Sequence, residues 1–377
     1  MGGPLQILIK PASGLCNLRC VYCFYCDEME KRGTGSYGLM SMETLEAVVR
    51  QAFAYAEERV GFLFQGGEPT LCGLPFFERL MEFEKQYNQK GIPVTNSLQT
   101  NGYGLTRDWA DFFAKHKFLV GVSVDGTKYT HDAFRVTEQG KGSFSSVMRT
   151  LELFAERGVE FNILTVVNRR TALAVSKLYA FYKKNGWRYL QFIPCLDPLG
   201  EKPGGREYSL IPEDYGTFLC RLFELWYADL RTGRAPYIRQ FENYISILMG
   251  MPAESCDMRG GCSLQFVVEA DGSVYPCDFY VIDEWRLGSF LTDSVPELSE
   301  TEQAKRFLAG GTGSREACKD CPYRFLCRGG CRRYWDEEGR GNYFCRSYRM
   351  LFEAALPRMQ EIAENIARQM HAAGRVR

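Results

Sequence analysis

Residues 5–26 read LQILIKPASGLCNLRCVYCFYC, an apolar run followed by three cysteines in the spacing C-x3-C-x2-C. The run Leu5–Ile9 has the length and apolar character of a buried strand. Cys16, Cys20 and Cys23 can bind three corners of a cubic four-iron cluster, whereas a closed structural cluster or zinc site needs four protein ligands. The triplet therefore predicts a cluster with one iron open to substrate or cofactor, and an open iron indicates catalysis.

The composition describes a globular protein with no electrostatic preference for a partner. The chain has 377 residues, of which 45% are hydrophobic, and this is enough for a sizeable core and two domains. Lys and Arg together number 46, as do Asp and Glu, so neither nucleic acid nor an anionic membrane is an expected partner. No apolar run approaches the roughly 18 residues that span a bilayer. The first apolar run, Leu5–Ile9, is too short for the apolar core of a signal peptide. We therefore expect a cytoplasmic protein. Its 15 cysteines are then expected to bind metal rather than form disulfides.

The first half of the chain alternates strand patterns with helix patterns. Strands are predicted at Leu5–Ile9, Val60–Gln65, Val94–Leu98, Phe118–Val124, Phe161–Val167 and Leu190–Pro194. Amphipathic helices are predicted at Glu43–Glu58 with Ser41 as N-cap, and at Pro75–Tyr87, Arg107–Lys115, Phe144–Arg157 and Ala172–Asn185. This βα repetition predicts a parallel sheet, either open or closed into a barrel, with an active site at the C-terminal strand ends.

A second group of cysteines begins where the alternation ends, near Gly250. Its members are Cys256, Cys262, Cys277, Cys318, Cys321, Cys327, Cys331 and Cys345, and an amphipathic helix is predicted after them at Tyr348–Met370. Eight thiols suit two sites of four ligands each. Zinc and iron–sulfur clusters both accept C-x2-C pairs, and the open triplet favours iron–sulfur because further clusters can relay electrons.

Several motifs together resemble a known family. These are the triplet, Gly66–Pro69 (GGEP), Cys262-x9-Gly272-x4-Cys277 and the following C-x2-C-x5-C-x3-C. They resemble a radical S-adenosylmethionine enzyme with a SPASM extension. The stretches FQGGEPTL, SLQTNG, GVSVDG and QFVVEADGSVYPCDFY are similar more narrowly to anaerobic sulfatase-maturating enzymes, over nearly the whole chain. Those enzymes oxidise a Cys or Ser of a sulfatase to Cα-formylglycine.

The resemblance implies an α/β fold with a defined order of parts. A partial (β/α)6 TIM-type barrel is expected at 1–235, a Cys-rich SPASM domain with two auxiliary clusters at 236–348, and a C-terminal helix at 349–377. The implied cofactors are S-adenosylmethionine and three four-iron (4Fe-4S) clusters. The resemblance assigns the triplet to the first cluster. It assigns Cys256, Cys262, Cys277 and Cys331 to one auxiliary cluster, and Cys318, Cys321, Cys327 and Cys345 to the other.

Contacts to S-adenosylmethionine are likewise implied by the resemblance. The implied residues are Tyr22, Gly66, Gly67, Glu68, Ser123, Arg135 and Leu196. Arg135 is expected to pair with the methionine carboxylate and Leu196 to cover the adenine. Without the resemblance, GGEP reads as an ordinary turn, Arg135 as a solvated charge and Leu196 as a core residue.

Asp278 matches the position of the family's proposed general base. An ordinary Asp titrates near 4 and a thiol near 8.5, so Asp278 needs burial or coupling of proton loss to radical formation. Our hypothesis is that a deoxyadenosyl radical removes a Cβ hydrogen and Asp278 takes the thiol or hydroxyl proton. An electron then passes to an auxiliary cluster. By position alone, Asp278 reads as a surface carboxylate.

The expected partners follow from the same resemblance. They are a sulfatase polypeptide with a C/S-x-P-x-R motif and a one-electron donor such as flavodoxin or ferredoxin. Tyr25, Gln65 and Gln99 are candidates for peptide contacts, because their motifs end at the same strand-end face. Cys26 is interpreted as a bystander, since a fourth thiolate would close the open iron. Cys72, Cys195 and Cys220 read as small buried hydrophobes.

Two alternatives remain open from the sequence. The first is a maturase that forms thioether or carbon–carbon crosslinks in a ribosomal peptide with the same clusters. The second is a non-catalytic electron carrier or a zinc-stapled interaction module, which would not cleave S-adenosylmethionine. It leaves both the triplet and GGEP unexplained.

Overall fold

The fold is described from a computed structural model that covers residues 2–311, 316–335 and 341–372. The chain divides into two compact units, each made of several segments. The first unit comprises Met1–Val124, His131–Asn162 and Ser263–Gly310, and the second comprises Asp125–Thr130, Ile163–Cys262 and Gly311–Arg377. The domain ranges 1–235, 236–348 and 349–377 stay a prediction, and each includes positions outside the described residues.

Parallel strands form the centre of the first unit. They are β1 (Leu5–Ile9), β2 (Val60–Phe64), β3 (Val94–Thr100) and β4 (Leu119–Ser123), adjacent in chain order. Leu5 pairs with Val60, and Val60 pairs in turn with Val94. Each strand lies within two residues of its predicted bounds, because short apolar runs between turn signals mark buried parallel strands well.

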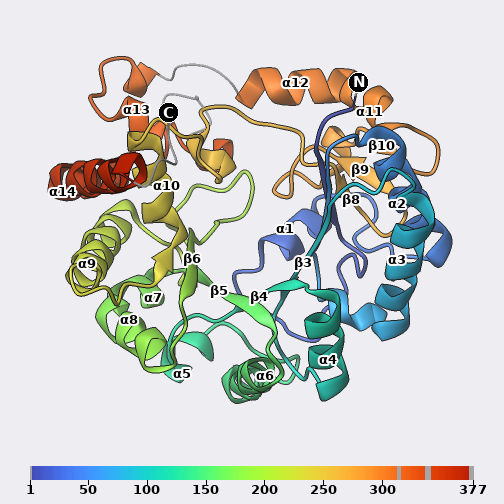
Figure 1. Cartoon of the computed structure of the whole chain (residues 1–377), viewed down its shortest axis with the longest axis horizontal. Coiled ribbons are helices and arrows are strands. Elements are labelled where there is room, and N and C mark those ends of the chain that lie inside the picture. Colours follow the sequence, from blue (N-terminus) through green and yellow to red (C-terminus); the bar gives the residue numbers. More distant parts are fainter. Residues whose placement is uncertain (1, 312–315, 336–340, 373–377) are drawn as a thin grey trace. The chain divides into compact units, whose positions relative to one another are not determined.

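Helices cover this sheet. They are α1 (Phe24–Glu30), α2 (Met42–Tyr55), α3 (Leu74–Tyr87), α4 (Arg107–His116) and α6 (Phe144–Arg157). Figure 1 shows α2, α3 and α4 on the outer side of the strands. Ser41 caps α2 as predicted, since its side chain accepts a hydrogen bond from the Thr44 N–H at 3.1 Å. Phe77 of α3 packs edge-on against Phe64 of β2 and Trp109 of α4, with ring centroids 5.1 and 5.5 Å apart.

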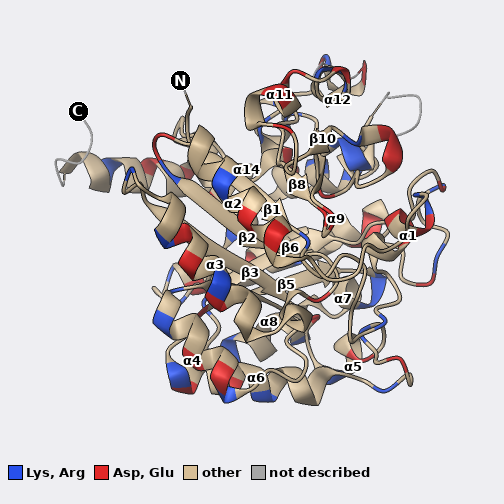
Figure 2. Ribbon diagram, turned by 90° about the vertical axis from the view of Figure 1, so that its right-hand side faces the viewer, with Lys and Arg blue, Asp and Glu red and all other residues tan. Residues whose placement is uncertain are grey.

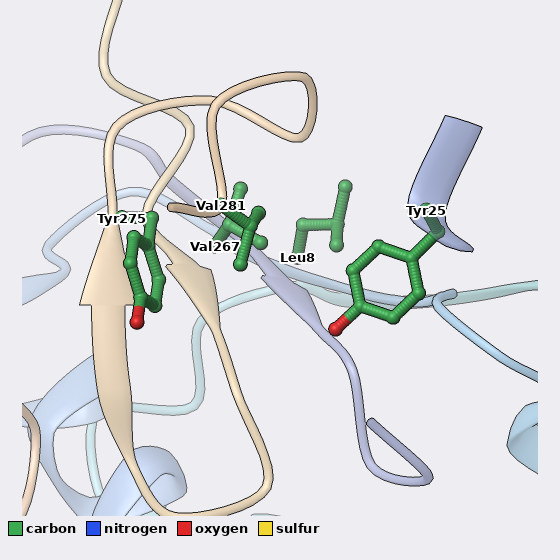
Figure 3. Packing of buried hydrophobic residues seen from close by; sticks show 5 residues of the cluster. All are labelled: Leu8, Tyr25, Val267, Tyr275 and Val281. Atoms are coloured by element: carbon green, nitrogen blue, oxygen red, sulfur yellow. The ribbon is translucent and has the colours of Figure 1, made fainter. Parts of the chain in front are cut away.

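A small antiparallel extension joins β1 from the far end of the sequence. β8 (Val267–Val268) pairs parallel with β1, Leu8 opposite Val267, and it continues into β9 (Ser273–Tyr275) and β10 (Gly288–Ser289). Figure 3 shows Tyr25 of α1 reaching toward Leu8 and Val267 of these two strands. Asp278, three residues after β9, lies beside Lys10, the residue that follows β1. No sequence pattern predicted the pairing of β8 with β1.

The second unit contains the rest of the βα alternation. β5 (Glu160–Val167), β6 (Tyr189–Pro194) and β7 (Tyr237–Ile238) pair parallel, Ile163 opposite Leu190 and Leu190 opposite Ile238. Its helices include α7 (Arg169–Leu173), α8 (Val175–Lys184), α9 (Pro212–Leu230), α10 (Arg239–Leu248), α13 (Arg324–Cys327) and α14 (Cys345–Ala372). The single helix predicted at Ala172–Asn185 is two helices that meet at Ala174. The helix predicted at Tyr348–Met370 is α14, whereas α9 and α10 were not predicted.

Shorter elements complete the description. They are α5 (Lys128–His131), α11 (Val295–Ser299), α12 (Glu302–Gly311) and the 3-10 turns at Pro69–Cys72, Cys256–Met258, Asp283–Trp285, Glu316–Cys318 and Arg332–Tyr334. Figure 2 shows basic and acidic residues interspersed along α3, α4 and α6. None of the described helices is long and apolar enough to cross a membrane. The α/β fold class, with βα repetition followed by a Cys-rich region and a C-terminal helix, is confirmed.

Candidate active site

The cysteine triplet lies on the loop between β1 and α1. Its backbone is held by a neighbouring segment: the Arg19 N–H donates to the Val136 carbonyl at 2.7 Å, and the Val21 N–H donates to the Phe134 carbonyl at 2.9 Å. Cys23 is the N-cap residue of α1. A cavity of about 230 Å³ opens here, lined among others by the three triplet cysteines and by Gly66 and Gly67. Two motifs far apart in the sequence therefore share one cavity.

The three thiols of the triplet have different surroundings. Cys16 Sγ accepts from the Leu18 N–H at 3.4 Å and from Asn101 Nδ2 at 3.6 Å, although burial raises the pKa of its thiol. Cys20 Sγ lies 3.9 Å from an Arg135 nitrogen. A hydrogen bond from Cys26 lowers the pKa of Cys23 to about 7, with Lys10 and Arg135 also lowering it. The environment at Cys23 thus favours the thiolate that a cluster ligand requires.

The GGEP loop packs its backbone against the residues just before Cys16. The Gly67 N–H donates to the Ser13 carbonyl and the Glu68 N–H to the Leu15 carbonyl, both at 2.8 Å. A Cβ on Gly67 would lie 2.0 Å from the Leu15 carbonyl oxygen, and Gly66 has φ +120°. Only glycine fits this close approach without a shift of the backbone.

The Glu68 carboxylate forms hydrogen bonds to protein groups and is shielded from solvent. It is buried, and burial raises its pKa. It accepts four hydrogen bonds: from Thr70 N at 3.2 Å, Thr70 Oγ1 at 2.7 Å, Thr100 Oγ1 at 2.9 Å and Asn101 N at 2.8 Å. Glu68 therefore ties the GGEP loop to the end of β3.

The other predicted cofactor contacts are distributed over both units. Tyr22 and Arg135 lie together in the first unit, with the guanidinium carbon 5.5 Å from the ring centroid. Ser123, at the end of β4, accepts from Gln99 Nε2 at 3.1 Å. Leu196 is a buried residue after β6 in the second unit. Its contact with adenine stays a prediction.

Asp278 is 7% exposed and surrounded by polar groups. Lys10 Nζ lies 2.6 Å from its Oδ1, and Gln65 Nε2 donates to its Oδ2. Its own N–H donates to Gln265 Oε1 at 3.1 Å. The reading of Asp278 as a surface carboxylate is therefore wrong. The hairpin of β8 and β9 is joined to β1 through β8, and Asp278 lies three residues after β9.

The sequence analysis missed Lys10. Its side chain is fully buried, and it directly follows the last residue of β1. A lysine at the C-terminal end of a predicted barrel strand is itself a signal, because that end carries the functional groups of the fold. The partner of Lys10, however, comes from the other end of the sequence.

The second cysteine group separates into two neighbourhoods within the second unit. Burial raises the pKa of Cys331, and the nearby thiols of Cys256 and Cys262 raise it further. Burial raises the pKa of Cys327 to about 12, and here the neighbouring thiols are Cys345, Cys318 and Cys321. Cys331 thus lies with cysteines some 70 positions earlier in the chain rather than with Cys327. Cys277 lies in the first unit, directly before Asp278.

The donor sets fit iron–sulfur clusters. They consist of thiols, which are the ligands these clusters require. Among the described residues, no three His, Cys, Asp or Glu side chains converge closely enough to hold a single metal ion. A cubic cluster places its ligands on separate corners and does not need that convergence.

Two family models match the chain. Residues 11–178 match the radical SAM superfamily, and residues 256–322 match the SPASM iron–sulfur cluster-binding domain. A cysteine-type anaerobic sulfatase-maturating enzyme from Clostridium novyi (strain NT) is 45% identical over 371 residues, covering 97% of this chain and 99% of the relative.

The chain belongs to the anaerobic sulfatase-maturating enzymes. A serine-type member from Bacteroides thetaiotaomicron is 32% identical over 390 residues, covering 97% of this chain and 93% of the relative. The solved structure of native anSMEcpe with bound AdoMet and Kp18Cys peptide superposes with a TM-score of 0.92 at 47% identity, and covers 96% of this chain and 99% of that one. As a member of this radical S-adenosylmethionine family, the chain is an oxidoreductase that uses three 4Fe-4S clusters and S-adenosylmethionine.

Proposed function

We propose that the chain oxidises a cysteine of a sulfatase polypeptide to Cα-formylglycine, and that Asp278 takes the proton of the target thiol. The family supplies the reaction class, and one observation supports the assignment of Asp278. Its carboxylate is buried between a cation, Lys10, and an amide donor, Gln65, at the strand ends. A base must lie within hydrogen-bond reach of its proton. Tyr25, whose ring Lys10 contacts, also lines the triplet cavity.

The residues of the chain bind and orient the reactants. When bound, the cofactors supply a 5′-deoxyadenosyl radical that removes a Cβ hydrogen, together with an acceptor for one electron. Gly66 and Gly67 present backbone to the methionine end of S-adenosylmethionine, and Glu68 fixes that backbone through its four hydrogen bonds. Arg135, beside Cys20, pairs with the methionine carboxylate. Tyr22, Ser123 and Leu196 complete the proposed cofactor contacts.

The proposed cluster ligands follow the cysteine neighbourhoods. Cys16, Cys20 and Cys23 hold the cluster that binds S-adenosylmethionine. Cys318, Cys321, Cys327 and Cys345 hold one auxiliary cluster, and their mutual proximity supports this set. Cys256, Cys262 and Cys331 hold the other together with Cys277, and the proximity of the first three supports the interleaved assignment.

Cysteine, rather than serine, is the proposed target residue. This chain is 45% identical to a cysteine-type relative and 32% identical to a serine-type relative at equal coverage. The proposal also includes the C-x-P-x-R sequence in the substrate, a one-electron donor such as flavodoxin or ferredoxin, and a cytoplasmic location.

An Asp278→Asn variant tests the base assignment. Anaerobically reconstituted protein is incubated with reductant, S-adenosylmethionine and a C-x-P-x-R peptide, and the products are read by mass spectrometry. We expect deoxyadenosine but no peptide aldehyde, with the iron content of the wild type. Asp283→Asn is the matched control, since Asp283 is an exposed carboxylate in the same segment. Full aldehyde yield from Asp278→Asn would refute the assignment.

The same assay tests the family-level alternative. In an aldehyde product the target residue has exchanged its sulfur for oxygen, whereas a thioether crosslink retains sulfur and loses two hydrogens. A parallel S-x-P-x-R peptide tests the preference for cysteine. We expect a faster reaction with the cysteine peptide, and equal rates would remove that part of the proposal.

A further inference from the structure

Lys10 is a buried cation whose neighbours are unusual for a lysine. Its side chain is 0% exposed, and its Nζ lies 2.6 Å from Asp278 Oδ1. Its backbone N–H donates to the Val268 carbonyl at 2.8 Å, so the pairing of β1 with β8 fixes its Cα. A Cβ on Gly66 would lie 3.0 Å from Lys10 Cβ, so the GGEP loop packs against its stem. A buried ammonium is costly unless it is paired, and Asp278 supplies the opposite charge, although neither Lys10 Nζ nor Asp278 Oδ1 has a hydrogen bond of good geometry among the described residues.

The aromatic ring of Tyr25 packs against the Lys10 ammonium. Lys10 Nζ lies 3.8 Å from the centroid of the Tyr25 ring, within the range of a cation–π contact. The Tyr25 hydroxyl donates to Glu269 and accepts from an Arg32 nitrogen at 3.2 Å. Donor and acceptor positions of this hydroxyl are therefore used inside the protein. What Tyr25 presents to the active site is its ring face, not a free hydroxyl.

A second buried ion pair anchors Tyr25. Arg32 Nη1 lies 2.8 Å from Glu269 Oε1, and both side chains are 0% exposed. Arg32 comes from the loop after α1, and Glu269 directly follows β8. The anchor thus ties α1, which begins at the cysteine triplet, to the segment that leads to Asp278. It fixes the ring on which Lys10 rests.

We propose that Lys10 is a positioning residue for the oxidation: it aims the Asp278 carboxylate at the target thiol. This inference rests on the proposed role of Asp278. In the step concerned, the S–H bond of the target breaks, the proton goes to a carboxylate oxygen of Asp278 and the electron pair stays on sulfur.

The geometry supports this assignment. Lys10 Nζ and Gln65 Nε2 contact the two different carboxylate oxygens of Asp278. Lys10 is held in turn by the Tyr25 ring and by its backbone hydrogen bond to Val268. The orientation of the carboxylate is therefore set by residues of the protein.

A Lys10→Ala variant with added propylammonium tests the proposal. Propylammonium restores the atoms that the substitution removes, and tetramethylammonium and the Lys10→Met variant separate rescue of the charge from refilling of the cavity. We expect aldehyde formation to fall by about 100-fold while deoxyadenosine is still released, with wild-type iron content. We expect propylammonium to raise the rate of aldehyde formation by Lys10→Ala at least about tenfold, with saturation at high concentration. Tetramethylammonium, which has no N–H, should not raise this rate.

Controls separate the possible outcomes. Lys31→Ala is the matched control, because Lys31 pairs with Asp27 at the partly exposed surface of the same segment. Aldehyde formation near the wild-type rate in Lys10→Ala, or a loss that propylammonium does not restore, would overturn the proposal. Lys10→Met, with a similar volume and no charge, is tested in parallel. If Lys10→Met loses aldehyde formation but keeps the full iron content, the result supports the proposal. If both Lys10→Ala and Lys10→Met lose iron, Lys10 is needed for cluster assembly and the proposal is overturned. Wild-type protein that forms no aldehyde would instead refute the proposed function itself.

Discussion

Gly67→Ala is the substitution whose effect can be worked out most directly from the structure. The added Cβ would lie 2.0 Å from the Leu15 carbonyl oxygen, 2.7 Å from the Leu15 carbonyl carbon and 3.0 Å from the Leu15 nitrogen. All three are backbone atoms, so no side chain can rotate away to make room. The GGEP loop or the loop before Cys16 must move by about 1.4 Å to restore an ordinary contact of 3.4 Å.

That displacement has a structural and a functional cost. Two hydrogen bonds lie on either side of the clash, from Gly67 N–H to the Ser13 carbonyl and from Glu68 N–H to the Leu15 carbonyl, both at 2.8 Å. Both would be stretched or lost. Each contributes about 1 kcal/mol, and the overpacking adds about 1–3 kcal/mol. A shift of about 1 Å in a group that orients a reactant can lower a rate by about 100-fold. We therefore expect reductive cleavage of S-adenosylmethionine to fall by about 100-fold.

Deoxyadenosine release from anaerobically reconstituted protein measures this effect. Iron content and circular dichroism establish that the variant is folded and loaded. Gly3→Ala is the control, because nothing lies within 4 Å of the position a Cβ would take there. Cleavage by folded Gly67→Ala at a rate within threefold of the control would refute the close-approach argument.

Three further predictions follow from single contacts. Burial raises the pKa of Glu84 to about 7 from its ordinary 4.5, against the hydrogen bond from Asn96, so its ionisation costs stability as the pH rises from about 4.5 to about 7. Glu84→Gln should therefore raise the melting temperature more at pH 8 than at pH 5.5, and an equal effect at both would contradict this. Arg135→Lys should raise the KM for S-adenosylmethionine about tenfold, because a lysine cannot make a two-pronged carboxylate contact; an unchanged KM would remove Arg135 from the cofactor site. Ser41→Ala deletes the cap on the Thr44 N–H and should cost about 1 kcal/mol, seen as a melting temperature about 2–4 °C lower with deoxyadenosine release unchanged.

The elements predicted best are those with local signals. The strands β1 to β6 and the helices α2, α3, α4 and α6 lie close to their predicted bounds, because each is an apolar or amphipathic run between turn residues. The helix predicted at Ala172–Asn185 divides at Ala174, since hydrophobic periodicity continues across a break that backbone geometry imposes. α9 and α10 were not predicted.

The candidate site shows the same division between local and distant signals. The triplet and GGEP were recognisable as motifs, because each uses residues at fixed short spacing. The hydrogen bonds from Thr70, Thr100 and Asn101 to the Glu68 carboxylate were not recognisable, since two of these donors come from a segment some 30 residues later in the chain. The grouping of Cys331 with Cys256 and Cys262 was implied by family resemblance alone and could not be derived from spacing.

The sequence by itself determined the chemistry of this protein. The three thiols in C-x3-C-x2-C indicate an open cluster, and the glycine loop after the second strand lies next to it. The eight further cysteines indicate auxiliary clusters, because thiols are the ligands that such clusters require. The tertiary structure alone decided which charges meet. β8 pairs with β1 across some 250 residues of chain, and that pairing delivers Asp278 to Lys10 and Glu269 to Arg32. The physical reason is that buried charges must find partners in space, and backbone hydrogen bonding between distant strands, which leaves no local pattern in the sequence, determines which partners they find.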